Sequence, residues 1–299
     1  MPGTVRISQH EKLNDCSMKR SIVCLTFDFD AISGWIARGM TSPSPISRGE
    51  FGPHVGVPRI LELLKRHDIV GSWFIPGHTL ETYPDASRRV AAMGHEIGHH
   101  GWTHRPPASL TPEQEEEELV RANEVIHALT GRYARGYRSP SWDLGPHSVE
   151  LLLKHGFSYD SSMMADDYIP YRVRHADVIS LEHPAVFGPT TRLIEMPVSW
   201  TLDDYPHFEF IRTPTWILPG NMNANDVLEN WIGDFTYLNQ NLDWGVITYT
   251  FHPFVIGRGH RMMMLEKLIR TLKEHGAVFM KLEDAAAEYE QRIPAPVGR

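Results

Sequence analysis

Short apolar runs of strand length alternate along the chain with stretches whose apolar residues recur at helical spacing. This pattern predicts strands at 21–27, 70–75, 95–98, 135–138, 157–159, 193–196, 244–251 and 277–280, and helices at 57–66, 80–93, 109–131, 146–155, 261–273 and 282–292. Such alternation is typical of βαβ units with a parallel sheet. About seven strand and helix units favour an α/β fold in a single domain, a closed or nearly closed β/α barrel, with a doubly wound open sheet as the alternative.

Two stretches interrupt this rhythm, 31–56 and 161–225, and both are rich in Pro, Gly and aromatic residues. Long loops inside a compact domain usually shape a site or an interface. We expect a barrel over residues 21–292, an N-terminal extension over 1–20, and a C-terminal tail over 293–299.

Composition and charge exclude several classes of protein. The chain has 299 residues, 41% hydrophobic residues and a formal net charge of -8, which is ordinary globular usage with an acidic surface. Such a surface repels phosphate backbones and anionic lipid, so neither nucleic acid nor membrane is an expected partner. The run Glu115–Glu118 is expected to be the solvated side of a helix. Because no secretory leader or membrane span is evident and Cys24 lies in an apolar run, we expect a cytoplasmic protein with a buried, reduced thiol.

Reactive side chains follow four of the predicted strands, and the carboxyl ends of parallel strands share one edge. Asp28 and Asp30 end the first strand on the same side of an extended chain. Carboxylates this close repel, and a divalent cation would relieve the repulsion while leaving one of them free as a base.

The segment 95–104 carries four histidines. His100 and His104 are four residues apart, which predicts two imidazoles on one face of a helical turn beyond the strand. Two imidazoles and one carboxylate suit zinc and leave coordination positions open. His95 and His99 share this spacing, and for them we favour packing or a supporting role.

Two further groups occupy the same expected edge. Arg138, in Arg138-Ser-Pro-Ser-Trp142, can pair with a carboxylate such as Asp28, although an ordinary buried ion pair is the alternative. His252, in Phe251-His-Pro, can serve as a proton donor, although a lone histidine is more often structural.

The order TFDFD, HxxxH, RSPSW and FHP resembles the polysaccharide deacetylase superfamily, carbohydrate esterase family 4. The resemblance covers about residues 21–292, and it implies a distorted (β/α) barrel and a homo-oligomer. It also implies the role of each site residue: Asp28 as general base, Asp30, His100 and His104 as metal ligands, Arg138 as the partner of the base, His252 as general acid, and the backbone N–H of Trp142 as an oxyanion donor.

The chain also departs from the family pattern. Gly101 stands where the family has a hydroxyl residue. The group that orients the acidic histidine is not evident, with Asp160, Asp166, Asp167 and Trp200 as candidates. The segments GEFGPHVGVPRIL, FIPGHTLETYP and YDSSMMADDYIPY resemble a branch that contains a peptidoglycan deacetylase-like protein, cyclic imide hydrolases and a metal-poor allantoinase; the two metal histidines argue against the metal-poor route.

The predicted function is hydrolysis of a carbon–nitrogen amide bond other than a peptide bond, with a divalent metal, preferably zinc. The substrate is an N-acetyl sugar or, because no export signal is seen, a small cyclic imide or ureide. Two alternatives from other classes are an inactive barrel that binds carbohydrate through Trp102, Trp142 and Trp200, and a structural component of an oligomer. The full set of candidate catalytic groups argues against the inactive barrel.

Overall fold

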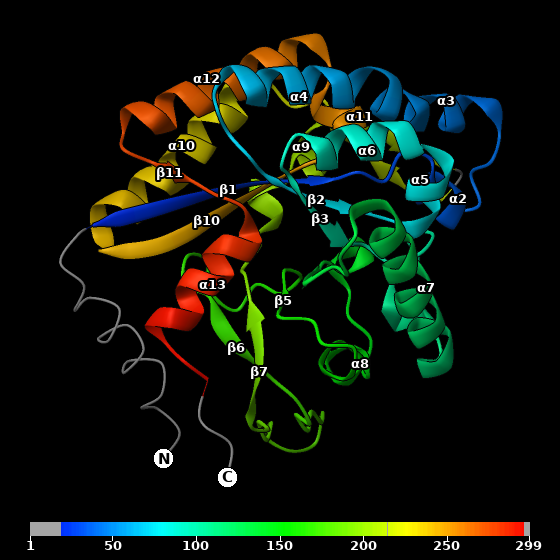
Figure 1. Ribbon diagram of the computed structural model, residues 1–299, viewed down its shortest axis with the longest axis vertical. Helices are drawn as coiled ribbons and strands as arrows, with labels where there is room; N and C mark the ends of the chain where they lie inside the picture. Colours follow the sequence, from blue (N-terminus) through cyan, green and yellow to red (C-terminus); the bar gives the residue numbers. More distant parts are fainter. Residues whose placement is uncertain (1–18, 214, 296–299) are drawn as a thin grey trace.

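The computed structural model describes residues 19–213 and 215–295, so most of the expected extension and tail, positions 1–18 and 296–299, lies outside the described residues. One curled sheet organises the fold (Figure 1). Its strand order is β10-β1-β2-β3-β4-β5-β7-β6, with β11 paired to β1. The strands are β1 (Arg20–Asp28), β2 (Ser72–Ile75), β3 (Glu96–His99), β4 (Gly136–Tyr137), β5 (Tyr159–Asp160), β6 (Tyr171–Arg174), β7 (Thr190–Glu195), β10 (Trp244–Phe251) and β11 (Val278–Phe279).

The sheet is a distorted half-barrel, which confirms the barrel prediction. All neighbours are parallel except β6 and β7, and β10 and β6 stand at the two ends of the order. The longest pairing joins β1 and β10, which run in register from Arg20 opposite Trp244 to Phe27 opposite Phe251. Both strands are buried over almost their whole length, because helices cover the sheet.

The main helices are α4 (Val57–Arg66), α6 (Pro84–Ala92), α7 (Pro112–Thr130), α8 (Ser148–Lys154), α10 (Ala224–Asn241), α12 (Gly259–Glu274) and α13 (Leu282–Arg292). Local chemistry sets the ends of α7. Thr111 and Gln114 form a capping box, Pro112 occupies the first helical position, and Gly131 ends the helix at φ 78°. The predicted bounds of α4, β10 and α13 are confirmed.

The single helix expected at 80–93 is wrong. The structure has two helices there, α5 (Gly77–Thr82) and α6, which are separated at Tyr83 with φ −126° and ψ 57°. Proline disfavours helical backbone at the residue before it, and Pro84 therefore breaks the helix at Tyr83.

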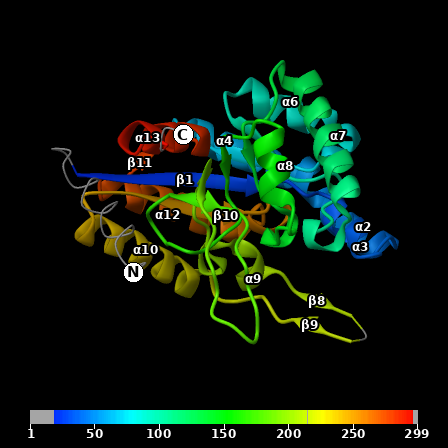
Figure 2. The same cartoon turned by 90° about the horizontal axis from the view of Figure 1, so that it is seen from below.

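The expected loop at 31–56 is mostly helical. It contains α2 (Ser33–Ala37), α3 (Pro43–Phe51) and one π-helical turn (Gly52–Gly56). The helix α10 was missed, although its buried Val227, Trp231 and Phe235 recur at helical spacing. The stretch 161–225 holds β6, β7, the short helix α9 (Asp204–Phe208) and a projecting hairpin of β8 (Ile211–Arg212) and β9 (Ile217–Leu218), seen in Figure 2.

The acidic run on α7 is not simply solvated. Glu115 and Glu118 are buried, where Glu115 accepts a hydrogen bond from Ser148 and Glu118 pairs with Arg105. The helix turns Glu115 and Glu118 toward the protein and leaves Glu117 exposed. The prediction that the whole run is the solvated side of the helix was therefore wrong for Glu115 and Glu118. Cys24 is a buried free thiol, as expected.

No helix among the described residues combines the length and the apolar character that crossing a bilayer requires.

Candidate active site

Four strand ends bring the candidate groups together. Asp28 is the last residue of β1, and His100, Arg138 and His252 each directly follow β3, β4 and β10. Because these strands are parallel, their carboxyl ends meet at one edge. The expected convergence on this edge is therefore found.

Asp30, His100 and His104 form a compact buried triad. The Nε2 atom of His100 lies 3.4 Å from Asp30 Oδ1, and that of His104 lies 3.5 Å from Asp30 Oδ2. One ligand atom from each residue falls within 4.8 Å of the other two. This spacing suits three ligands of one cation.

Unsatisfied polar atoms in this triad fit a metal ion. His100 donates from Nδ1 to the carbonyl of Arg138 at 2.8 Å, which turns the lone pair of Nε2 toward Asp30. His100 Nε2 and Asp30 Oδ1 are buried and have no hydrogen-bond partner among the described residues. Burial alone would raise the pKa of Asp30, but the imidazoles of His104 and His100 hold that pKa below its usual value. An ionised carboxylate facing two imidazoles is a suitable ligand set for zinc.

The chain between His100 and His104 is not the helical turn that we expected. It is a bend with left-handed backbone at Gly101 (φ 69°) and His104 (φ 61°). A Cβ atom on Gly101 would lie 2.9 Å from Pro140 Cγ. Glycine therefore replaces the family's hydroxyl residue at a position that combines positive φ with close packing.

His95 and His99 have supporting roles. His95 Nδ1 accepts from the N–H of Gly71 at 3.0 Å, and His99 donates from Nε2 to Leu119 O at 3.0 Å. Burial lowers the pKa of His95 to about 4 and that of His99 to about 3, so both are neutral. These contacts agree with the packing interpretation.

Arg138 holds Asp28 in place. It is fully buried, and its Nη1 donates to Asp28 Oδ1 at 2.8 Å and to Thr26 Oγ1 at 2.8 Å. The rest of the guanidinium is held by Ser161, through its carbonyl at 3.0 Å and its hydroxyl at 2.9 Å. The other Asp28 oxygen lies 3.8 Å from His100 Nε2. Asp28 is thus placed beside the triad without being one of its three closest members.

Asp204 and Asp203 orient His252, and the sequence candidates for this role were wrong. Asp204 Oδ1 accepts from His252 Nδ1 at 2.8 Å, and Asp203 Oδ1 lies 3.5 Å from the same atom. Burial alone would lower the pKa of His252, but these carboxylates outweigh burial and raise it to about 10. His252 Nε2 points toward Asp30, 3.8 Å from Oδ2. The imidazolium can therefore donate a proton into the site.

The four earlier candidates have other contacts. Asp160 is hydrogen-bonded to Glu195 and Ser162, Asp166 accepts from the backbone of Tyr168 and Ile169, Asp167 interacts with Asp166, and Trp200 stacks on Trp142 at 4.2 Å. The paired aspartates directly after Trp200-Thr-Leu were the available signal, but no periodicity connects them to His252.

The backbone N–H of Trp142 is already used in this structure, because it donates to Ser139 O at 2.9 Å. Ser141 and Trp142 both have left-handed backbone, with φ 58° and 51°, and both line the pocket. The adjacent N–H of Ser141 has no hydrogen-bond partner among the described residues. The N–H of Ser141 is therefore available as an oxyanion donor in this loop. The N–H of Trp142 becomes available only when it gives up its hydrogen bond to Ser139.

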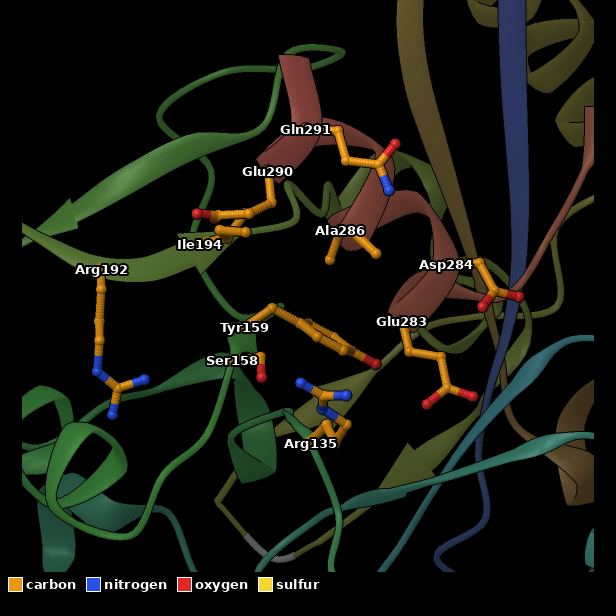
Figure 3. Close-up of a pocket in the computed structure, with 11 residues that line it drawn as sticks. Arg135, Ser158, Tyr159, Arg192, Ile194, Glu283, Asp284, Ala286, Glu290 and Gln291 are labelled. Carbon is orange, nitrogen blue, oxygen red and sulfur yellow. The ribbon is translucent and has the colours of Figure 1, made fainter. Parts of the chain in front are cut away.

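A pocket of about 100 Å³ joins these groups. Its lining comprises Asp28, Asp30, Arg38, His100, His104, Ser141, Trp142, Trp200, Asp203, Tyr205 and His252. A larger pocket of about 500 Å³ lies against α13, and Figure 3 shows Arg135, Tyr159 and Glu283 around it. None of the candidate catalytic groups lines the larger pocket, so the smaller one is the candidate active site.

Comparison with known proteins agrees with this geometry. Residues 17–159 match the family model described as polysaccharide deacetylase. The chain is 37% identical to a peptidoglycan deacetylase of Helicobacter pylori over 92% of this chain and 98% of that protein, and 30% identical to a peptidoglycan deacetylase-like protein of Gibberella zeae over 93% and 89%.

Solved structures share the fold. One from Mycobacterium smegmatis, whose name assigns it to the polysaccharide deacetylases, is 27% identical, with a TM-score of 0.80 over 95% of both chains. An allantoinase has a TM-score of 0.76 over 93% of both chains at 22% identity, a likeness that shows the fold alone.

Proposed function

This chain belongs to the polysaccharide deacetylase family, and from that premise we propose that it is a metal-dependent hydrolase that releases acetate from an N-acetyl sugar of the peptidoglycan type. The family acts on amide carbon–nitrogen bonds. The observation that carries the proposal is the convergence of Asp30, His100 and His104 beside Asp28.

We propose that Asp30, His100 and His104 hold a divalent cation, with zinc preferred by this set of ligands. When bound there, such an ion acts as a Lewis acid toward the substrate carbonyl and lowers the pKa of water. The buried, unsatisfied atoms of Asp30 and His100 support this assignment.

Asp28 is proposed as the general base. Its carboxylate takes a proton from the water that attacks the amide carbon, since it lies beside the triad and is not needed as a ligand. Arg138 fixes one Asp28 oxygen at 2.8 Å, so the other oxygen remains directed toward His100 and the site.

His252 is proposed as the general acid. When the carbon–nitrogen bond breaks, the nitrogen needs a proton, and the imidazolium of His252 supplies it from Nε2. Asp204 holds the opposite ring nitrogen and so fixes the ring orientation. The products are a carboxylic acid and an amine.

The negative charge that develops on the carbonyl oxygen needs a donor. We retain the Trp142 N–H for this role and add the neighbouring N–H of Ser141, which needs no exchange of bonds.

The size of the pocket supports a second candidate. A volume of about 100 Å³ holds an acetamido group or a small ring, whereas the remainder of a glycan has to lie outside it. Hydrolysis of a cyclic imide or ureide is therefore the alternative substrate class.

One assay separates the two candidates. Zinc-loaded protein is incubated with N-acetylglucosamine oligomers and with succinimide-type rings, and released acetate and opened ring are quantified, with Asp28→Asn as the control. Acetate release that depends on Asp28 supports the deacetylase. Ring opening alone replaces it with the alternative, and turnover of neither rejects both.

We also propose a homo-oligomer. The segment 178–187 exposes Val178, Ile179, Leu181 and Phe187, and apolar side chains of this kind are often covered by another subunit. Light scattering on the purified protein measures the mass directly, and a monomer at micromolar concentration contradicts the proposal.

A further inference from the structure

Arg38 is a cation in the candidate site that the proposed mechanism does not use. It directly follows α2, and its Nη1 donates to the carbonyl of Gly34 at 2.7 Å. The side chain lines the same pocket as Asp30 and His104.

Gly34 allows Arg38 to lie close to the proposed metal ligand. A Cβ atom placed on Gly34 would lie 3.2 Å from Arg38 Nη1 and 3.7 Å from Asp30 Oδ2. Arg38 Nη1 and Asp30 Oδ2 are therefore separated by no more than the sum of these two distances. A substrate group of a few atoms can reach the guanidinium while the scissile bond stays beside Asp30.

The carboxylates of the pocket are already balanced by other groups. Asp28 pairs with Arg138, Asp203 faces His252, and Asp30 faces two imidazoles. Arg38 is exposed to solvent at the rim of the pocket, and it forms no ion pair with a carboxylate among residues 19–213 and 215–295. An unpaired cation at the site attracts a negatively charged ligand despite the net charge of -8.

Tyr205 supplies a second unsatisfied group next to Arg38. The guanidinium carbon lies 5.8 Å from the centre of the Tyr205 ring. The Tyr205 hydroxyl is buried and has no hydrogen-bond partner among the described residues, although the residue lines the pocket. Burial raises the pKa of Tyr205 to about 12, so the hydroxyl remains a donor at neutral pH.

We propose that Arg38 and Tyr205 form an anion-binding subsite beside the metal triad, and that the substrate carries a carboxylate a few atoms from the scissile amide bond. The planar guanidinium matches the two oxygens of a carboxylate, and the phenol adds a third donor. This inference rests on the proposed function, because it names the class of substrate that the same site takes.

Two matched pairs of ligands test the subsite. N-acetylmuramic acid differs from N-acetylglucosamine by a lactyl ether that carries a carboxylate, and dihydroorotate differs from dihydrouracil by one carboxylate. Binding to zinc-loaded Asp28→Asn protein is measured by calorimetry, so that turnover does not interfere. The same measurement is made on Asp28→Asn protein that also carries Arg38→Met, and on Asp28→Asn protein that carries the charge-preserving change Arg38→Lys. Arg89→Met, at an exposed arginine on α6, is the matched control.

The expected result is roughly 10-fold or tighter binding of the anionic member of one pair, by analogy with other charge-assisted hydrogen bonds. Arg38→Met abolishes that preference and changes the affinity for the neutral member by less than about 3-fold, Arg38→Lys keeps part of it, and Arg89→Met keeps all of it. The absence of any preference, or its persistence in Arg38→Met, overturns the subsite.

Turnover by the protein with Asp28 intact separates this inference from the proposed function. If a preference that depends on Arg38 is found but neither pair is hydrolysed, the subsite stands and the proposed function fails. If hydrolysis occurs without a charge preference, the subsite fails alone. The pair that is hydrolysed identifies the source of the carboxylate as a sugar or a ring.

Discussion

Replacing Glu195 with glutamine tests a buried carboxyl pair that supports the active site from behind. Asp160 and Glu195 are fully buried and interact with each other, and Asp160 Oδ2 and Glu195 Oε2 have no hydrogen-bond partner among the described residues. The other Glu195 oxygen accepts from the N–H groups of Ser162 and Met163 at 2.8 and 2.9 Å. The same loop carries Ser161, which holds Arg138.

The magnitude follows from one shared proton. Burial raises the pKa of Asp160 to about 6 and that of Glu195 well above its ordinary value. Above about pH 6.5 we expect Glu195 to be protonated in the folded protein and ionised in the unfolded chain. The folded state then binds one more proton, so the free energy of unfolding falls as pH rises, by about 1.4 kcal/mol per pH unit. This contribution ends at the pH where Glu195 itself ionises in the folded protein.

Denaturant unfolding between about pH 6.5 and pH 8.5 measures this slope in wild type and in Glu195→Gln. Glutamine imitates the protonated acid, since its oxygen accepts from the same N–H groups and its amide donates to Asp160. The slope should be about 1.4 kcal/mol per pH unit smaller in the variant than in wild type, because His252, whose pKa is raised to about 10, contributes equally in both proteins. The variant should retain hydrolytic activity, whereas Glu195→Ala should lose stability and activity together. Glu117→Gln, on the exposed side of α7, is the control. Equal slopes in wild type and Glu195→Gln would refute the shared proton.

The remaining predictions concern the candidate chemistry. Asp28→Asn should lower kcat by on the order of 10²-fold or more without loss of bound metal, checked by kinetics and metal analysis; unchanged kcat contradicts the role of the base. Chelation should abolish activity and lower Tm, and added zinc should restore both in wild type but not in His104→Ala; full recovery of the variant excludes His104 as a ligand. Asp204→Asn should lower kcat by on the order of 10²-fold with KM little changed, because His252 loses its charged partner; equal kcat shows that Asp204 does not orient the acid.

The arrangement of the core could be predicted from local patterns. Apolar runs and helical spacing located β1, α4, β10 and α13, because burial of one side chain after another leaves a periodic trace in the sequence. Pro84 was the informative residue that the periodic pattern overlooked, since it divides one predicted helix into two.

The proposed site was accessible for a related reason. Asp28, His100, Arg138 and His252 stand at or directly after strand ends, and a parallel sheet brings such ends together regardless of their separation in the chain. The triad with Asp30 and His104 required only this rule and the chemistry of ligands. The local shape was different, because positive φ at Gly101 and His104 replaces a helical turn.

The sequence by itself determined most of the core strands and helices and the residue types at the site edge, because both are encoded in short, regular spacings. Only the tertiary structure decided that Asp204 holds His252, that Asp160 lies against Glu195, and that Arg38 lines the pocket without an acidic partner. Each of these contacts joins aperiodic segments far apart in the chain, and each depends on the direction of a side chain that no spacing along the sequence specifies.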